Sequence, residues 1–171
     1  DLLVLGKGLS GGYMPLSAVG CRVEHLQAIR RHAGNFIHGH TFSHHAVAAA
    51  TGLSVLEILQ RECLVDRAAE LGKYLGEAFL PLSQHQHVAD VRGIGLMWAV
   101  ELVRDKQTRK PYPRSAQVAE RLFDRLLEVG VLTYPSTGFV DGDGDALMIG
   151  PPFIISENEL DFVINAIQEA V

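Results

Sequence analysis

A lysine that directly follows an apolar strand, between two glycines, is the feature that most constrains this chain. Residues 2–5 predict a buried strand, which ends at the stretch Gly6-Lys7-Gly8-Leu9-Ser10-Gly11-Gly12. Burial disfavours the charged form of a lysine side chain. We therefore expect Lys7 to be a buried amine that is available in its neutral form to condense with an aldehyde. Position alone leaves open the alternative of a surface lysine in a glycine turn.

The same glycines resemble a nucleotide-binding pattern. Gly6-x-Gly8-x-x-Gly11 follows a strand, as the dinucleotide-binding fingerprint does. That fingerprint must open a helix, however, and Gly12 and Pro15 stand where its first turns would lie. Glu24 comes too early to be the acidic residue of such a site. A non-catalytic nucleotide-binding α/β module is therefore the weaker alternative.

Hydrophobic periodicity predicts helices and short strands along the rest of the chain. Leu16–Gly20 is expected to pair with the first strand, and 34–42 is expected to be a loop. Helices are expected at 23–31, 44–60, 64–80 and 118–129, and strands at 88–92, 96–103, 131–134 and 146–149. In the helix at 44–60 the apolar stripe is expected to be Val47, Leu53, Leu56 and Ile58. Ser156 and Glu159 form a capping-box pattern at the start of the last helix.

Composition excludes several classes of protein. The formal charge of −5 comes from 15 basic and 20 acidic residues without long runs, so no nucleic-acid-binding or membrane-binding face is expected. No apolar run is long enough for a membrane span, and no signal peptide is recognisable. Cys21 and Cys63 lack a CxxC spacing and predict buried free thiols in a reducing compartment, which favours a cytoplasmic location.

Metal binding is not expected. Five histidines in or near the predicted loop 34–42 lack a cysteine or carboxylate that would complete a tetrahedral zinc site; they are His32, His38, His40, His44 and His45. The acidic turn 141–145 resembles part of a calcium loop, but Pro152 stands where the bidentate glutamate would be. A solvated turn is the expected structure of that segment.

Four motifs in order carry a resemblance that covers the whole chain. They are the lysine segment from Asp1 to Leu16, the loop His38-Gly39-His40-Thr41-Phe42-Ser43, the hairpin Arg92-Gly93-Ile94-Gly95-Leu96-Met97, and the closing segment Pro151-Pro152-Phe153-Ile154-Ile155-Ser156. In this order they closely resemble class III (omega-type) pyridoxal-phosphate (PLP)-dependent aminotransferases.

The resemblance implies an α/β fold, the PLP-dependent transferase fold type I. Residues 1–62 would be the end of the PLP-binding large domain, and 63–171 the small C-terminal α/β domain. The chain opens directly in a strand, so we expect it to begin in the middle of a domain.

The resemblance also implies the site residues. Lys7 would be catalytic, would bind PLP as a Schiff base, and would move a proton between the substrate carbon and the cofactor. Thr41 would bind the cofactor phosphate of the neighbouring subunit, which implies a homodimer with a shared active site. Small-molecule amines and oxo acids would be the substrates.

Two departures from the family pattern bear on substrates. Ornithine-type members carry an arginine for the substrate carboxylate where Met148 stands, and others carry a mobile arginine where 139–141 lie. The absence of both favours amines or omega-amino acids as donors, because an α-carboxylate needs a guanidinium for oriented binding. A different PLP-dependent reaction, such as that of an aminomutase or decarboxylase, stays open as an alternative.

Overall fold

The structure, a computed structural model, describes all residues 1–171. It divides into two compact units, Asp1–Cys63 and Leu64–Val171. Each unit is described by itself.

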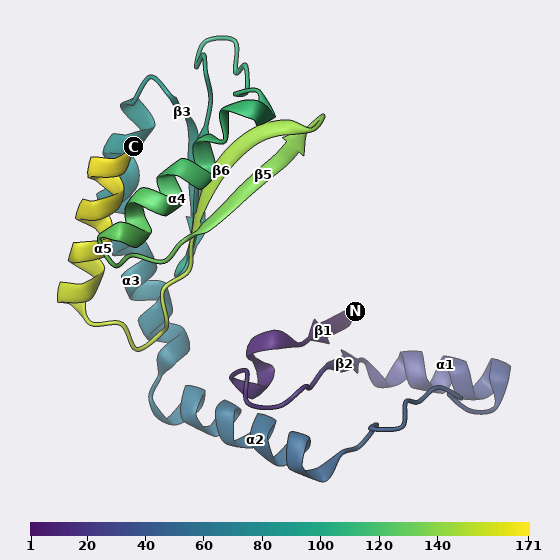
Figure 1. Ribbon diagram of the computed structural model, residues 1–171. Coiled ribbons are helices and arrows are strands. Elements are labelled where there is room, and N and C mark those ends of the chain that lie inside the picture. Colours follow the sequence, from purple (N-terminus) through teal and green to yellow (C-terminus); the bar gives the residue numbers. More distant parts are fainter. The chain divides into compact units, whose positions relative to one another are not determined.

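The first unit contains a two-stranded sheet and two helices (Figure 1). Strand β1 (Leu2–Leu5) pairs antiparallel with β2 (Ala18–Cys21), and a short 3-10 turn, η1 (Lys7–Ser10), follows β1. Helices α1 (Val23–Ala33) and α2 (Ala46–Arg61) flank a long loop. The strand pairing, both helices and the loop are therefore confirmed.

Burial in the first unit differs from the sequence-based prediction. Leu2, Leu3 and Val4 of β1 are 65%, 59% and 76% exposed, because a two-stranded ribbon has no second layer over it within this unit. The predicted stripe of α2 is likewise exposed, and the buried positions of this helix are Ala48 and Gly52. Both cysteines are free and exposed, so the prediction of buried thiols was wrong.

The second unit is a four-stranded antiparallel sheet with helices on one face (Figure 1). Its strand order is β3-β4-β6-β5. The elements, in chain order, are α3 (Leu64–Phe79), η2 (Leu80–Gln84), β3 (Val88–Ile94), β4 (Met97–Leu102), η3 (Arg114–Ala116), α4 (Val118–Glu128), β5 (Tyr134–Val140), β6 (Asp143–Ile149) and α5 (Glu157–Ala170).

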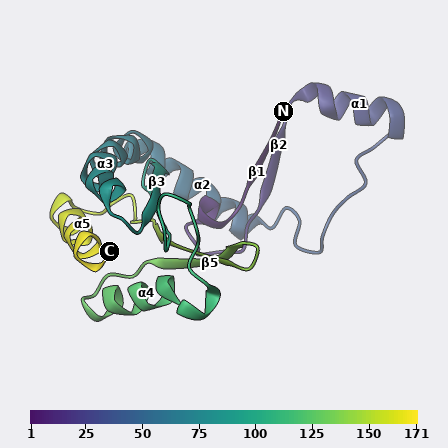
Figure 2. The same cartoon turned by 90° about the horizontal axis from the view of Figure 1, so that it is seen from above.

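The helices of the second unit enclose a continuous apolar core. Figure 2 shows α3 beside β3 and α4 beside β5, with α5 between the two helices. Alternate residues of the strands point into this core, among them Val100, Leu147 and Ile149, and meet Leu75 and Phe79 of α3. The opposite face of the sheet carries no helix in this unit. The predicted hairpin at 88–103 and the α/β fold class are confirmed.

The strand predicted at 131–134 starts later than expected. Val131 is only 4% exposed and packs in the core as loop, and its N–H donates to the carbonyl of Leu126 at the end of α4. The chain turns at Gly130, where φ is +88°, and β5 begins only at Tyr134.

The acidic segment 141–145 is not simply a solvated turn. Asp141 and Gly142 form the turn between β5 and β6, but Asp145 is completely buried. One carboxylate oxygen of Asp145 accepts the N–H of Ala119 at 3.0 Å. It therefore caps α4 from the neighbouring strand, in place of Gln117, whose side chain makes no capping bond.

The capping box of α5 is confirmed. The Ser156 hydroxyl accepts the N–H of Glu159 at 3.3 Å, and the Glu159 carboxylate accepts the N–H of Ser156 at 2.9 Å. The hydrogen bond from the Ser156 side chain lowers the pKa of Glu159 below its ordinary value.

None of the helices combines the length and the apolar character that a membrane span requires.

Candidate active site

Lys7 stands at the point where β1 ends and the 3-10 turn begins. Its backbone is left-handed, with φ of +48°, which is uncommon for a residue with a side chain. Its amine makes no hydrogen bond or ion pair within the chain. A Cβ atom added at Gly6 or Gly8 would meet nothing within 4 Å. The backbone on both sides of Lys7 is therefore open, and the amine of Lys7 has no partner within the chain.

The expected burial of Lys7 is not found. Lys7 is exposed, since within the first unit the turn is packed on only one side, by α2. Desolvation by the first unit alone therefore does not account for a reactive amine, and the assignment of a role to Lys7 depends on the motif that surrounds it.

The geometry of the glycine-rich segment contradicts the dinucleotide-binding alternative. That fingerprint needs a helix whose N-terminus faces the pyrophosphate, between parallel strands. Here the glycines form a four-residue 3-10 turn and a tight loop, and the following strand pairs antiparallel with β1.

Thr41 lies in the loop between α1 and α2 and is exposed. The loop is closed around it, because the N–H of His40 donates to the Ser43 hydroxyl at 2.8 Å and the N–H of Ser43 donates to the carbonyl of His40 at 2.9 Å. The hydroxyl and the N–H of Thr41 make no hydrogen bond within the chain. Both groups are thus free to bind an anion such as a phosphate.

The histidines near Thr41 have structural contacts. The ring of His45 accepts the N–H of Ala48 at 3.2 Å and so caps α2. The rings of His38 and His40 lie edge to face, with centroids 5.1 Å apart. No three histidine, cysteine or carboxylate side chains of the chain come together in a way that could hold a metal ion.

A groove of about 520 Å³ lies on the helix-free face of the second unit's sheet. It brings together Met148 and Phe139, which stand at the two places where the resemblance described above would put a carboxylate-binding arginine. Ile94, Met97 and Ala146 make most of the remaining lining apolar.

Arg92 is the one charged residue in the lining of this groove. One of its terminal nitrogens donates to Glu101 at 2.6 Å and to Asp90 at 2.9 Å. These two hydrogen bonds, the one to Glu101 first, raise the pKa of Arg92 above its ordinary value. Its positive charge is therefore already compensated by two carboxylates.

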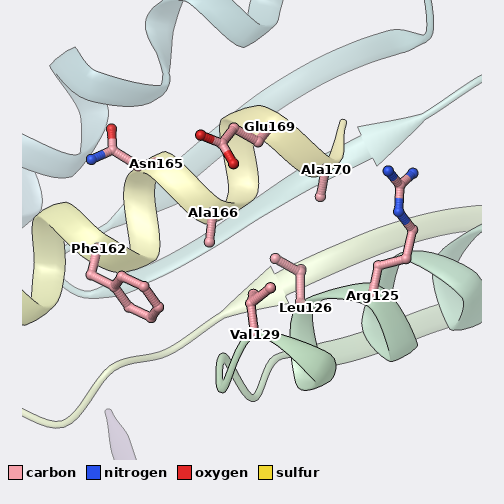
Figure 3. Close-up of a pocket in the computed structure, with 8 residues that line it drawn as sticks. All are labelled: Arg125, Leu126, Val129, Phe162, Asn165, Ala166, Glu169 and Ala170. Atoms are coloured by element: carbon pink, nitrogen blue, oxygen red, sulfur yellow. The ribbon is translucent and has the colours of Figure 1, made fainter.

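A second cavity, of about 330 Å³, lies between α4 and α5 (Figure 3). Phe162 and Ala166 face Val129 and Leu126 across it, and Arg125 and Glu169 lie at its edges. None of the residues predicted to be functional lies there.

Comparison with known proteins agrees with the motifs. The family model described as "Aminotransferase class-III" matches residues 1–171. The chain belongs to the class III aminotransferases. It is 34% identical to a protein named "Aminotransferase" from Gibberella zeae, over 100% of this chain and 34% of that protein. It is 33% identical to adenosylmethionine-8-amino-7-oxononanoate aminotransferase from Methanocaldococcus jannaschii, over 100% of this chain and 36% of that protein.

Solved structures share the fold of this class III chain. An amine transaminase from an uncultivated Pseudomonas species, in its PLP-bound form, matches with a TM-score of 0.89 and 34% identity over 99% of this chain and 38% of that chain. Fold type I is thereby confirmed, and the cofactor of class III aminotransferases is PLP. The chain spans little more than a third of the length of the relatives it matches.

The sequence analysis missed three residues whose side chains hold the lysine turn, α2 and α4 in place. Ser10 is 1% exposed and donates its hydroxyl hydrogen to the carbonyl of Met14. His45 caps α2, and Asp145 caps α4. A polar residue just before a helix was a usable signal for His45. No local pattern identifies the other two, because Asp145 lies on a strand far from α4 in sequence, and serine is common in turns without being buried.

Proposed function

We propose that this chain is part of an aminotransferase that takes an amino group from an amine or omega-amino acid and passes it to an oxo acid. The donor leaves as an oxo compound and the acceptor leaves as an amino acid, so the exchange needs no external oxidant. The observation that carries the proposal is Lys7, an unpaired amine on a glycine-lined turn in a class III chain.

Lys7 is proposed to have two roles. As a nucleophile it holds the cofactor as a Schiff base, and as an acid and base it moves a proton at the substrate carbon. PLP, when bound, supplies the aldehyde that takes up the amino group and a ring that accepts electrons. A Cβ atom at Gly6 or Gly8 would meet nothing within 4 Å, so the backbone of the turn is open to the approach of a ring. Desolvation of the amine then has to come from parts of the site other than the first unit.

Covalent trapping tests the role of Lys7. The intact protein, loaded with PLP and reduced with borohydride, is expected to carry the cofactor on the peptide that contains Lys7, as measured by peptide mass. Amine donors should then release their oxo products faster than α-amino acids do. A label on another lysine would refute the assignment of Lys7, and release of carbon dioxide from the donor would favour a decarboxylase.

Thr41 is proposed to bind the cofactor phosphate of a second subunit, so that the active site is shared in a homodimer. The support is its free hydroxyl and N–H on a closed loop, together with the family motif around it. Residues 1–62 are proposed to belong to the large domain and 63–171 to the small domain.

Thr41→Val is expected to weaken PLP binding about 10- to 100-fold, because a hydrogen bond to a charged group is lost. Equilibrium titration of the apoprotein measures this, with Thr41→Ser as the matched control that retains the hydroxyl. If PLP affinity were the same in Thr41→Val, or if the active protein sedimented as a monomer, this assignment would be wrong.

The preference for amines is supported by the residues at the two positions where the family pattern would place a carboxylate-binding arginine. Met148 and Phe139 stand at these positions and are apolar, and the charge of the neighbouring Arg92 is compensated by Asp90 and Glu101. A donor with a carboxylate next to its amino group would find no uncompensated cation among these residues, whereas an apolar amine would lose no interaction.

A further inference from the structure

The first unit buries only three residues, and all three lie where the lysine turn meets α2. They are Ser10, Ala48 and Gly52. Every other side chain of this unit is at least partly exposed. The contact between the turn and the helix is therefore the only core of the segment that carries Lys7.

The turn is closed by a short series of hydrogen bonds, two of which involve Ser10. The N–H of Leu9 donates to the carbonyl of Gly6 and that of Gly11 to Gly8, each at 3.0 Å. The carbonyl of Ser10 accepts the N–H of Tyr13 at 3.1 Å. The Ser10 hydroxyl, buried beneath the turn, donates to the carbonyl of Met14 and joins the turn to the chain that leads into β2.

Helix α2 packs against this turn at Gly52, where a side chain would displace the terminal methyl group of Leu16. A Cβ atom at Gly52 would lie 2.6 Å from the side chain of Leu16 and 3.5 Å from the carbonyl oxygen of Leu9. A Cβ atom at Gly11, where φ is +60°, would lie 3.3 Å from Val55. Contacts below about 3 Å require the neighbouring atoms to move.

Lys7 needs such support because its backbone is strained. A left-handed φ costs a residue with a side chain free energy and persists only where surrounding contacts determine it. The amine itself makes no contact that would fix its direction. The point at which the Lys7 side chain leaves the backbone is thus set by the turn, and the turn is held by Ser10 and α2.

We propose that Ser10 and Gly52 are positioning residues that fix the backbone from which the Lys7 side chain extends, the Ser10 hydroxyl by closing the lysine turn and Gly52 by letting α2 pack against it. The inference rests on the proposed role of Lys7 as the cofactor-binding lysine. It assigns no contact between Ser10 and the cofactor.

Ser10→Ala and Gly52→Ala of the intact protein test this inference, with Ser54→Ala on the exposed face of α2 as the matched control. In the apoprotein, hydrogen exchange at the amides of Gly11 and Tyr13 is expected to accelerate about 2- to 12-fold in Ser10→Ala, the effect of one lost hydrogen bond. In the PLP-loaded protein, the pH midpoint of the visible absorbance band should shift and kcat should fall while KM stays within about twofold. The control should match the wild type in all three measurements.

The outcomes separate the two proposals. Borohydride labelling at a lysine other than Lys7 in the wild type would overturn the proposed function itself. Labelling at Lys7 together with unchanged exchange and an unchanged pH midpoint in both variants would overturn only the positioning role. If neither variant folds, hydrogen exchange of the wild type tests the inference instead. A turn that is held by Ser10 and α2 should protect the amides of Gly11 and Tyr13, so they are expected to exchange more slowly than the amides of β1. Faster exchange than in β1 would contradict the inference.

Discussion

Replacing Lys7 with alanine is expected to lower kcat of the intact protein by about 10²- to 10⁴-fold, the usual effect of removing a group that transfers a proton in the rate-determining step. The variant should also lose the covalent attachment of PLP while still binding PLP noncovalently. Stopped-flow and steady-state measurements with an amine donor give the rate, and borohydride reduction followed by mass measurement gives the attachment.

Lys73→Ala is the matched control for this prediction. Lys73 is also an exposed lysine, but it lies on α3 in the second unit and belongs to none of the four family motifs. It should keep the rate and the covalent attachment of the wild type. If Lys7→Ala kept more than half of the wild-type kcat, the amine of Lys7 would have no part in the chemistry and the proposed function would lose its main residue.

The position of Lys7 was predictable, but its surroundings were not. The apolar run before it and the glycines around it are local signals, and the strand, the turn and the antiparallel partner strand all follow from them. Burial is not a local property. Leu2 to Val4 are apolar but exposed, because no layer within the first unit covers β1.

Helix α2 shows a second limit of sequence reasoning. Its length follows from helical periodicity, but the face that it buries is made of the small residues Ala48 and Gly52, not of the large apolar ones. A search for the most hydrophobic face selects Val47 and Leu53 instead, which are 60% and 58% exposed. Close approach of two backbones favours the smallest side chains, and hydrophobicity alone does not detect them.

The second unit was easier to predict where its strands alternate, as in β4, where the buried residues Val100 and Leu102 stand on either side of the partly exposed Glu101. The hairpin of β3 and β4 was predicted to within a few residues. The sequence alone does not explain why the hairpin contains Gly93 and Gly95. A Cβ atom at Gly93 would lie 2.2 Å from the ring of Trp98, and Gly95 turns the chain with φ of +53°.

Gly72→Ala is expected to destabilise the second unit by about 1–3 kcal/mol. Helix propensity alone predicts the opposite sign, since alanine is favoured over glycine in a helix interior by about 1 kcal/mol. The structure reverses this preference, because a Cβ atom at Gly72 would lie 2.4 Å from the carbonyl oxygen of Gly95 and 2.6 Å from its Cα atom. These are backbone atoms, and the same carbonyl accepts the indole N–H of Trp98 at 2.8 Å, so they cannot move without breaking that bond.

Two other glycines calibrate the measurement, which is urea unfolding of the intact protein. At Gly76, also in α3, a Cβ atom would meet the outer edge of the Trp98 ring at 2.7 Å, so Gly76→Ala should cost less, because a ring edge yields more readily than backbone. At Gly150 nothing lies within 4 Å, and Gly150→Ala should leave the unfolding midpoint nearly unchanged. The order Gly72, Gly76, Gly150 in decreasing cost is what close packing of α3 on the hairpin requires. If Gly72→Ala were as stable as the wild type, α3 and the hairpin of β3 and β4 would have to lie farther apart than these distances state. Helix propensity would then determine the stability of the variant.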